Sequence, residues 1–288
     1  MLKTKNNFFA LVYNFLMNRV CIFAHYDKDN IIDDYVIYYL NALKKDFNKI
    51  IFVSDSDLPK EQTEKLSSIC DYVQAYHHGE YDWGSYKFGY IIAKQNNWLF
   101  DADELLLCND SVYGPVFSLE PIFHKMSLDD CDFWGIFENK YGLSVNVMEP
   151  HIQSWFILLK KNVLTSNLFD NFISSVRHLE NKNDIIQEYE IGFTQKMSRY
   201  YKYKALYTSS KGNAVNCATT KLLEQGFPFI KTVVIRKYIL NFKYVPKELV
   251  KLIKNHAKRM GSKPFMTKIL KTLFWKRKMR KFLTVKNL

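Results

Sequence analysis

The chain of 288 residues is 48% hydrophobic and 24% charged, which is typical of a globular protein with one large domain, or with one domain and an appendage. Five scattered cysteines without a Cys-x-x-Cys pair exclude a disulfide framework and a cysteine-ligated zinc site, and they indicate reduced thiols in the cytosol. No apolar run reaches the ~18–20 residues that span a bilayer. The apolar residues 8–17 lack a signal-peptide cleavage site, so we expect there a helix or strand packed on the domain.

The net charge of +12 is unevenly distributed. Residues 231–288 contain 18 Lys and Arg and one acid, Glu248, for a charge of +17, whereas the first 230 residues carry −5. A near-neutral body with a strongly basic tail predicts a polyanionic surface as partner. We therefore expect a body at residues 1–230 and a basic helical region at residues 231–288.

The first third of the chain alternates short apolar runs with amphipathic helical patterns. Strands are expected at residues 19–26, 49–54 and 72–76, and helices at residues 31–43, with Asn30 as the cap, and at residues 59–70. This strand–helix–strand order predicts a parallel sheet with right-handed crossovers.

A segment with three glycines follows the third strand, at residues 77–89. Its glycines permit a close backbone approach and a helix start suited to phosphate. The Gly-x-Gly-x-x-Gly and P-loop patterns are both missing, which argues against a dinucleotide fingerprint and a P-loop. His77 and His78 are adjacent near a strand end and point to opposite faces, so a joint metal site is not expected.

The apolar run at residues 105–108 ends in Asn109 and Asp110, which predicts a buried strand followed by a turn. Side chains at the carboxyl end of such a strand face the crevice where ligands bind, so Asp110 is placed for a ligand or a metal. An Asx-type turn, in which Asn109 and Asp110 bond the nearby backbone, explains the same residues. The Asp-x-Asp at Asp101 and Asp103 precedes the strand and lies away from that crevice.

The α/β pattern continues through the body, with helices expected at residues 119–126, 161–178 and 184–201 and strands at residues 132–136 and 155–159. Glu190 lies beside apolar residues of the last of these helices, which places its carboxylate at the edge of a cleft. The alternative is an ordinary solvated glutamate.

Two basic helical patterns follow in the C-terminal region, at residues 245–259 and 264–282. The second mixes Phe, Leu and Trp with Lys and Arg, which suits a helix lying on an anionic membrane. Nucleic-acid binding and a basic helix packed on the core are the alternatives.

Short segments spread over residues 19–231 resemble the rhamnan synthesis F family, glycosyltransferases of bacterial cell-surface polysaccharide assembly. The matching segments are residues 24–27 (AHYD), 52–54 (FVS), 79–89, 107–115 (LCNDSVYGP), 132–135 (DFWG), 151–156 (HIQSWF), 189–194 (YEIGFT) and 226–231 (GFPFIK). These motifs do not specify the sugar.

The resemblance implies a GT-A-like α/β fold, in which a Rossmann-type, mostly parallel sheet flanked by helices binds a nucleotide-sugar donor. It puts Asp110 where that fold has an Asp-x-Asp for a divalent cation, Mg²⁺ or Mn²⁺, so Asp110 is the expected metal ligand. Only one carboxylate stands there, which leaves metal dependence open. Asp27 and Asp55 are expected at the nucleoside, and the glycine segment along the diphosphate or sugar. The expected donor-binding residues are Asp27, Asp55, Gly79, Asp82, Lys87, Gly89, Asn109 and Ser111.

The resemblance also implies inverting hexosyl transfer, in which a base deprotonates the acceptor hydroxyl and another group stabilises the leaving diphosphate. Glu190 is the expected base, with Glu188 as the next candidate. Asp110 with a metal is expected to stabilise the diphosphate, and His151 to contact the acceptor or the leaving group. A retaining mechanism stays open.

The expected activity is transfer of rhamnose or another deoxysugar to a cell-surface polysaccharide or lipid-linked glycan. A cytoplasmic protein attached peripherally to the anionic inner membrane would perform it. One alternative is a non-catalytic nucleic-acid-binding protein that uses the basic region, although the body has no RNA-binding signature. The other is an inactive glycosyltransferase-like scaffold, suggested by the missing second aspartate.

Overall fold

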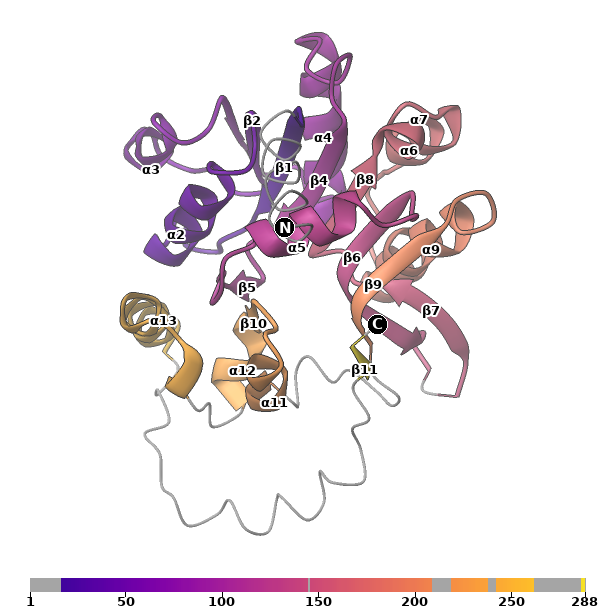
Figure 1. The fold of residues 1–288 in the computed structure, drawn as a ribbon. Coiled ribbons are helices and arrows are strands. Elements are labelled where there is room, and N and C mark those ends of the chain that lie inside the picture. The colour runs from indigo at the N-terminus through magenta and orange to yellow at the C-terminus, as the bar shows by residue number, and fades with distance from the viewer. Residues whose placement is uncertain (1–16, 145, 209–218, 238–241, 262–285, 288) are drawn as a thin grey trace, which may run out of the picture.

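The computed structural model describes residues 17–144, 146–208, 219–237, 242–261 and 286–287, and these residues form a mixed α/β fold around one large sheet (Figure 1). Within them the strand order is β11-β9-β6-β8-β4-β1-β2-β3, with β7 paired to β6, and β5 and β10 form a separate small sheet. The strands are β1 (Arg19–His25), β2 (Lys49–Ser54), β3 (Tyr72–Ala75), β4 (Glu104–Asn109), β5 (Val112–Tyr113), β6 (Phe133–Tyr141), β7 (Met148–Ile152), β8 (Phe156–Lys160), β9 (Tyr203–Thr208), β10 (Ile230–Lys231) and β11 (Lys286–Asn287).

Most strands of the large sheet run in one direction. β3, β2, β1 and β4 are parallel neighbours; β8 is antiparallel to both β4 and β6, so β6 and its parallel neighbour β9 share the direction of the first four. The mostly parallel α/β sheet that the sequence predicts is therefore confirmed. It brings the carboxyl ends of β1, β2 and β4 to the same edge.

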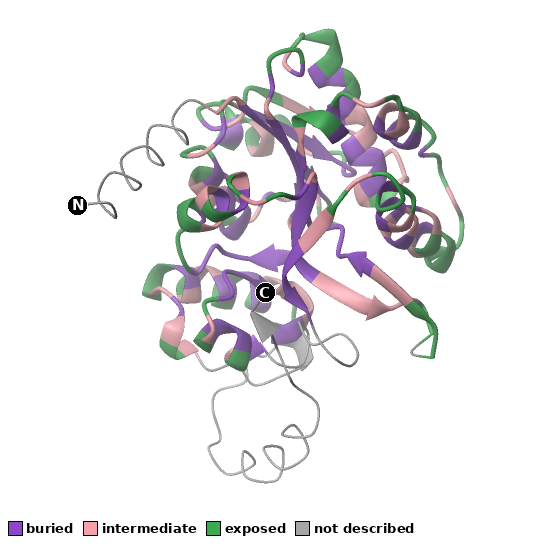
Figure 2. Cartoon of the chain, turned by 45° about the vertical axis from the view of Figure 1, so that its right-hand side comes forward, coloured by how far each residue is buried: buried purple, intermediate pink, exposed green. Residues whose placement is uncertain are grey.

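Helices cover both faces of the sheet. Side chains alternate between the faces along each strand, and the buried strands carry apolar side chains on both faces, so each face needs a covering layer. Cys21 and Phe23 of β1 pack into one apolar cluster, whereas Val20, Ile22 and Ala24 pack into the other. The first cluster is closed by α2 (Asp34–Leu43), α5 (Glu120–Ser127), α11 (Thr219–Glu224), α12 (Thr232–Lys237) and α13 (Lys247–Arg259). The second is closed by α4 (Tyr81–Gln95), α6 (Lys161–Leu164), α7 (Asn167–Ser174), α8 (Lys182–Ile185) and α9 (Gly192–Met197). Figure 2 shows the central strands of the sheet as buried, whereas β3, most of β7 and the end of β6 are at intermediate exposure or exposed.

Several predicted boundaries need correction. Asn30 does not cap α2: it lies in a turn at φ 57°, and the helix begins at Asp34. The helix expected over residues 161–178 is interrupted, because Ser166 caps a new helix by accepting a hydrogen bond from the N–H of Phe169. The helix expected at residues 59–70 is only α3 (Lys60–Thr63) and a 3₁₀ turn, Glu64–Leu66. β5, β7, β9 and β10 have no counterpart in the expected pattern.

The described part of the C-terminal region up to Ala257 joins the same core as the body. Phe229 and Ile230 precede the predicted boundary and Val234 and Leu249 follow it, and all four lie in one apolar cluster. The boundary as a domain division stays a prediction. The expected elements at residues 8–17, apart from Met17, and 264–282 lie outside the described residues. In the described part of the chain, no helix combines the length and apolarity that a membrane crossing needs.

Candidate functional site

Asp110 lies where β1 and β4 end side by side. Its Oδ2 accepts a hydrogen bond from the backbone N–H of Tyr26 at 3.1 Å, and its backbone oxygen accepts one from the hydroxyl of Tyr35 at 3.0 Å. The Asx-type bond of this turn is made by Asn109, whose Oδ1 accepts from the N–H of Ser111 at 3.1 Å. The carboxylate of Asp110 is thus not used for the local turn and faces the end of β1.

Asn109 links three polar side chains from different elements. Its Nδ2 donates to Asp82 Oδ2 of α4 at 2.7 Å, and its Oδ1 accepts from the hydroxyl of Ser111 at 2.6 Å. The same hydroxyl accepts a hydrogen bond from Lys231 Nζ of β10 at 2.8 Å. The polar chain Asp82–Asn109–Ser111–Lys231 therefore runs beside Asp110.

A second polar group surrounds Glu190. Its Oε2 accepts from the hydroxyl of Ser154 at 2.5 Å and from the N–H of Ser154 at 3.4 Å, and its Oε1 lies 3.7 Å from His151 Nε2. His151 Nδ1 donates to the carbonyl of Glu149 at 2.7 Å, which leaves Nε2 directed at Glu190. Glu190 is in a π-helical segment, Ile186–Ile191, between α8 and α9. Such segments are rare and are frequent at functional sites.

The charge of Glu190 affects the pKa values of Asp82 and Lys231, which belong to the polar chain beside Asp110. Burial raises the pKa of Asp82 to about 6, with the negative charge of Glu190 adding to the effect and Lys231 opposing it. Burial and the charge of Asp82 raise the pKa of Asp110 well above its ordinary value. The contacts of Asn109, Ser111 and Trp155 also connect the two groups, since Lys231 binds Ser111 and lies over Trp155, next to Ser154. We therefore treat Asp82, Asp110, Glu190 and Lys231 as one candidate site and call it the crevice site, after the predicted crevice.

The pKa values of Glu190 and His151 are shifted in opposite directions. Burial alone would raise the pKa of Glu190, but hydrogen bonds with His151 and Ser154 bring it below its ordinary value. Burial alone would lower the pKa of His151, but its contacts with Glu190 and the Glu149 carbonyl raise it. Glu190 is therefore a carboxylate at neutral pH, the form that accepts a proton.

Lys231 is the member of the crevice site that the sequence did not identify. It lies over the ring of Trp155, with Nζ 5.4 Å from the ring centroid, and burial lowers its pKa to about 8 against the pull of Glu190, Asp82 and Asp110. It comes to the site because β10 pairs with β5, which places Lys231 opposite Val112. In the sequence it ends the family-like segment 226–231 and begins the basic C-terminal region, but neither feature assigned it a role in the site.

Asp27 and Asp55, expected at the nucleoside, lie at the ends of β1 and β2 and have intramolecular partners. Asp27 forms an ion pair with Arg259 of α13 and accepts the N–H groups of Asp29 and Ile31. Asp55 Oδ1 accepts the N–H groups of His78 and Gly79, at 2.7 and 2.8 Å. Asp27 thereby holds the C-terminal helix, and Asp55 holds the loop before α4. Their contact with a nucleoside stays a prediction.

The other residues of the glycine segment are also explained by internal contacts. Gly79 has φ 70°, a backbone conformation that favours glycine. Lys87 pairs with Glu80 and donates to the carbonyl of Val176 at 3.0 Å. Gly89 lies inside α4, where a Cβ would come 2.3 Å from Cγ2 of Ile22. Close helix–sheet packing accounts for Gly89 without a ligand.

Metal-ligating groups are sparse. Within the described residues there is no cluster of three or more His, Cys, Asp or Glu side chains with the arrangement of a metal site. The Asp101 and Asp103 pair is at the opposite end of β4 from Asp110, and Asp103 accepts the N–H of Asn18. This agrees with its predicted exclusion from the crevice.

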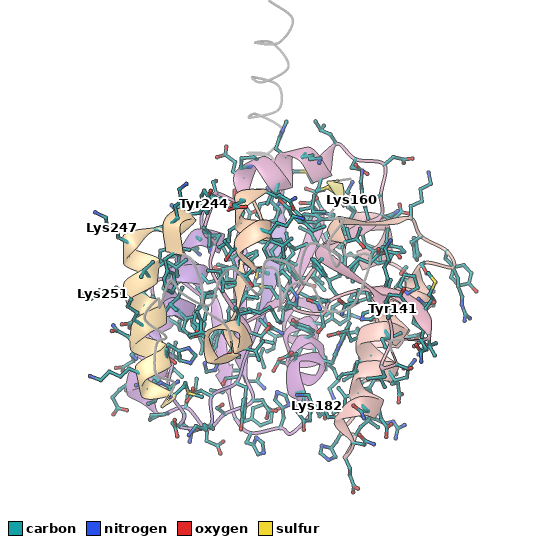
Figure 3. The ribbon with its side chains drawn as sticks, turned by 90° about the horizontal axis from the view of Figure 1, so that it is seen from below. Tyr141, Lys160, Lys182, Tyr244, Lys247 and Lys251 are labelled. Carbon is teal, nitrogen blue, oxygen red and sulfur yellow. The ribbon has the colours of Figure 1, made fainter. Side chains whose placement is uncertain are left out.

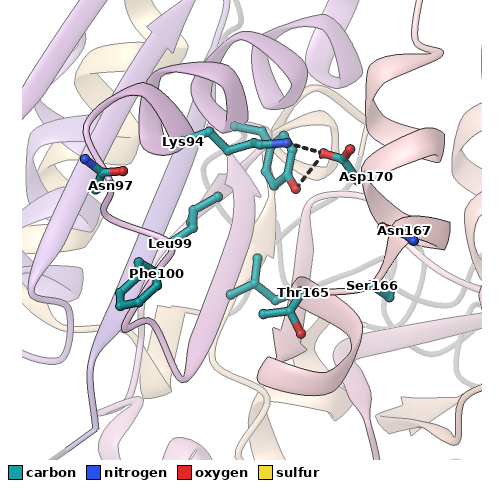
Figure 4. A pocket seen from close by; sticks show the side chains of 10 residues that line it. Lys94, Asn97, Leu99, Phe100, Thr165, Ser166, Asn167 and Asp170 are labelled. Atoms are coloured by element: carbon teal, nitrogen blue, oxygen red, sulfur yellow. Dashed lines mark hydrogen bonds and ion pairs between the residues drawn. The ribbon is translucent and has the colours of Figure 1, made fainter.

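A separate cavity of about 310 Å³ lies between the end of α4 and the start of α7 (Figure 4). Lys94 donates to Asp170 at 2.6 Å and the hydroxyl of Tyr90 donates to the same oxygen at 3.0 Å, so its charged groups are already paired. None of the crevice-site residues lines it. This cavity and the crevice site are therefore separate.

Comparison with known proteins gives one family and several distant folds. The model of the family described as rhamnan synthesis protein F matches residues 50–262. No curated protein matches the chain. Among solved structures, core-mannan synthase A from Aspergillus fumigatus in its Mn/GDP form is 10% identical with a TM-score of 0.35, over 55% of this chain and 63% of that one. This chain thus spans less than two thirds of that protein.

Two further structures are matched over more of their length. A cytidylyltransferase from Leptospira borgpetersenii is 12% identical with a TM-score of 0.42, over 87% of this chain and 98% of that one. A glycosyltransferase involved in glycosylation of the major capsid of PBCV-1 is 10% identical with a TM-score of 0.37, over 74% and 92% of the two chains.

Proposed function

The chain belongs to the rhamnan synthesis protein F family, and from this premise we propose that it is a glycosyltransferase. The proposed reaction transfers a sugar, with rhamnose or another deoxysugar as the first choice, from a nucleotide-sugar donor. The proposed acceptor is a growing cell-surface polysaccharide or a lipid-linked glycan. Family membership and the α/β fold support the reaction class, and the site supports the assignment of roles.

One observation carries the proposal. Asp110 lies at the carboxyl end of β4, where α/β sheets bind ligands. Lys231 lies beside it through Ser111 and is coupled electrostatically to both Asp110 and Glu190. The crevice site thus combines groups that can stabilise a charged leaving group with an ionised carboxylate that can take the proton of an acceptor hydroxyl. Glycosyl transfer requires both functions in one site.

In the proposed inverting step, the acceptor hydroxyl oxygen forms a bond to the anomeric carbon. The bond from that carbon to the diphosphate oxygen breaks, and its electron pair stays on the diphosphate. The hydroxyl proton passes to Glu190, which is ionised at neutral pH and is held in place by Ser154. His151, directed at the same carboxylate, contacts the acceptor or orients the base.

A divalent cation fits this site in a limited way. The negative charge of Asp82 helps to raise the pKa of Asp110, and a nearby cation would favour the ionised form of Asp110 instead. Mg²⁺ needs only one or two protein carboxylates when phosphates and waters complete its shell, so Asp110, with Asp82 beside it, would hold the ion. Bound there, the ion would neutralise negative charge on the diphosphate.

We also propose peripheral attachment to the anionic cytosolic face of the membrane. The support is charge: residues 231–288 carry +17, and in α13 the exposed residues Lys247, Lys251, Lys254 and Lys258 recur at helical spacing. Lys247 and Lys251 project outward from α13 in Figure 3. Each basic residue near an anionic surface adds about 1 kcal/mol. Such a position would bring the crevice site to a lipid-linked acceptor.

A thermal-shift screen of the full chain tests the donor class. The ligands are nucleoside diphosphates and nucleotide sugars of the common bases, with and without Mg²⁺ or Mn²⁺. Binding to the native state at about 100 times the dissociation constant stabilises it by about 2.7 kcal/mol. A shift of about 2–4 °C per kcal/mol makes this readily measurable. If no nucleotide moves the midpoint of a cooperative transition, the glycosyltransferase proposal is wrong.

A further inference from the structure

We propose that Lys231 binds the diphosphate of the donor and stabilises it as the leaving group. The inference rests on the proposed function and extends it, because a residue of the protein would supply positive charge to the donor phosphates. Its basis is the position of the Lys231 ammonium relative to Ser111, Trp155 and Asp110.

The first argument is that the ammonium has spare hydrogen-bonding capacity. A lysine ammonium has three N–H donors. In the described part of the chain Lys231 Nζ donates to the hydroxyl of Ser111 and forms no ion pair with a carboxylate. Lys87 and Lys204, by contrast, each pair directly with an acid. Lys231 can therefore accept an anionic partner without losing an existing one.

The second argument is that Lys231 is fixed in place. β10 and β5 pair in an antiparallel register that sets Lys231 opposite Val112, directly after the turn containing Asp110 and Ser111. The N–H of Thr232 also donates to the carbonyl of Ser111 at 2.9 Å. The ammonium nitrogen lies over the ring of Trp155, 5.4 Å from its centroid, and the indole N–H of Trp155 donates to Gln153 at 2.6 Å. A pre-positioned donor costs little ordering entropy when the ligand binds.

The third argument is the chemistry of the leaving group. When the anomeric carbon–oxygen bond breaks, the departing oxygen keeps the electron pair and the diphosphate gains negative charge, while Glu190 takes the hydroxyl proton. A fixed ammonium beside that oxygen stabilises this charge without reorganisation. Lys231 contacts Ser111, next to Asp110, and lies over Trp155, next to Ser154, which holds Glu190. The ammonium is therefore placed between the residues proposed for the diphosphate and the proposed base.

The test is calorimetric titration of full-length protein with three probes of each common base: the nucleoside diphosphate, the monophosphate and the nucleoside. Wild type is compared with Lys231→Met, Lys231→Arg and the exposed control Lys202→Met, whose ion pair with Asp130 is at the surface. Each protein is measured in EDTA and in Mg²⁺. Thermal midpoints establish that each variant is folded.

We expect Lys231→Met to weaken diphosphate binding by roughly 10- to 100-fold, the value of a hydrogen bond to a charged group, with nucleoside affinity unchanged. Lys231→Arg should recover part of the loss, and Lys202→Met should match wild type. Equal diphosphate affinity in Lys231→Met overturns the assignment, and so does an equal loss for nucleoside and diphosphate, which would show a structural role. If wild type binds none of the diphosphates, the proposed function itself fails, and the inference fails with it.

Discussion

Replacement of Glu190 by Gln tests the catalytic half of the site with little disturbance of the fold. Gln has the same length, and its amide oxygen can accept the hydrogen bonds that Ser154 now donates to Oε2 at 2.5 and 3.4 Å. What is lost is the negative charge that faces His151 Nε2 at 3.7 Å. The substitution should therefore change turnover, through loss of the base, and the pKa of His151.

The effect on turnover should exceed the effect on stability. A general base contributes about 10²–10⁴-fold, or about 3–5 kcal/mol of the barrier. The Glu190 side chain is 23% exposed and that of His151 is 3% exposed, so loss of their ion pair should cost about 1–3 kcal/mol of unfolding free energy. The variant should therefore remain folded under assay conditions, with donor affinity close to wild type, while kcat falls.

His151 supplies an independent readout. Its pKa is raised in the folded protein, so the ion pair stabilises the native state below the unfolded value of about 6.5 and this stability is lost as pH rises through the folded pKa. In Glu190→Gln burial should dominate, so the pKa of His151 should fall below its usual value and the pH-dependent stability should disappear. NMR titration of the His151 ring measures the first, and thermal unfolding over pH 5–9 the second.

Glu188→Gln is the matched control, since Glu188 lies in the same π-helical segment and is partly exposed. It should retain turnover and leave the His151 titration unmoved. Full kcat in Glu190→Gln would refute the assignment of the base. Loss of kcat in Glu188→Gln alone would move the base to Glu188.

Three further changes test other parts of the site. Asp110→Asn should abolish transfer with the fold intact, whereas Asp103→Asn at the other end of β4 should be active; a nucleotide-sugar consumption assay decides, and full turnover of Asp110→Asn would contradict the assignment. Arg259→Met should lower the unfolding free energy by about 1–3 kcal/mol, because it leaves partly buried acids unpaired. The pKa of Asp27 is lowered by Arg259 against the effect of burial, so this stability is present above the unfolded pKa of about 3.9 and is lost as pH falls through the lower folded value. The variant should therefore show a shallower acid dependence in urea unfolding; an unchanged acid limb would count against the pair. A protein ending at Ser262 should sediment less with anionic vesicles than the full chain, and the difference should shrink with salt; equal sedimentation, or retention of the full chain by nucleic acid alone, would remove the membrane proposal.

The sheet was predictable from sequence because its elements are local patterns. Residues 19–26 and 49–54 are apolar runs of strand length, and the repeat of apolar residues over residues 31–43 is helical. Asp110 could be placed at a strand end for the same reason. The parallel strand order then brought Asp110 to the carboxyl edge of β1 in the structure.

The remainder of the site depends on contacts between distant parts of the chain. Lys231 reaches Ser111 only because two two-residue strands pair across more than a hundred positions, which has no local signal. The ion pair of Arg259 with Asp27 is longer in range still. Gly89 shows a different limit of sequence-based prediction. The sequence does not tell whether a glycine leaves room for a ligand or, as at Gly89, for the side chain of Ile22.

The central claim is that the donor diphosphate lies between Asp110 and Lys231, at the carboxyl ends of β1 and β4. A crystal structure of the full chain with the nucleoside diphosphate that gives the largest thermal shift tests this most directly. We predict phosphate oxygens within hydrogen-bond distance of Lys231 Nζ and the nucleotide in the crevice site. A nucleotide bound instead in the cavity beside Lys94 and Asp170, or in the crevice with its phosphates directed away from Lys231, would contradict the account.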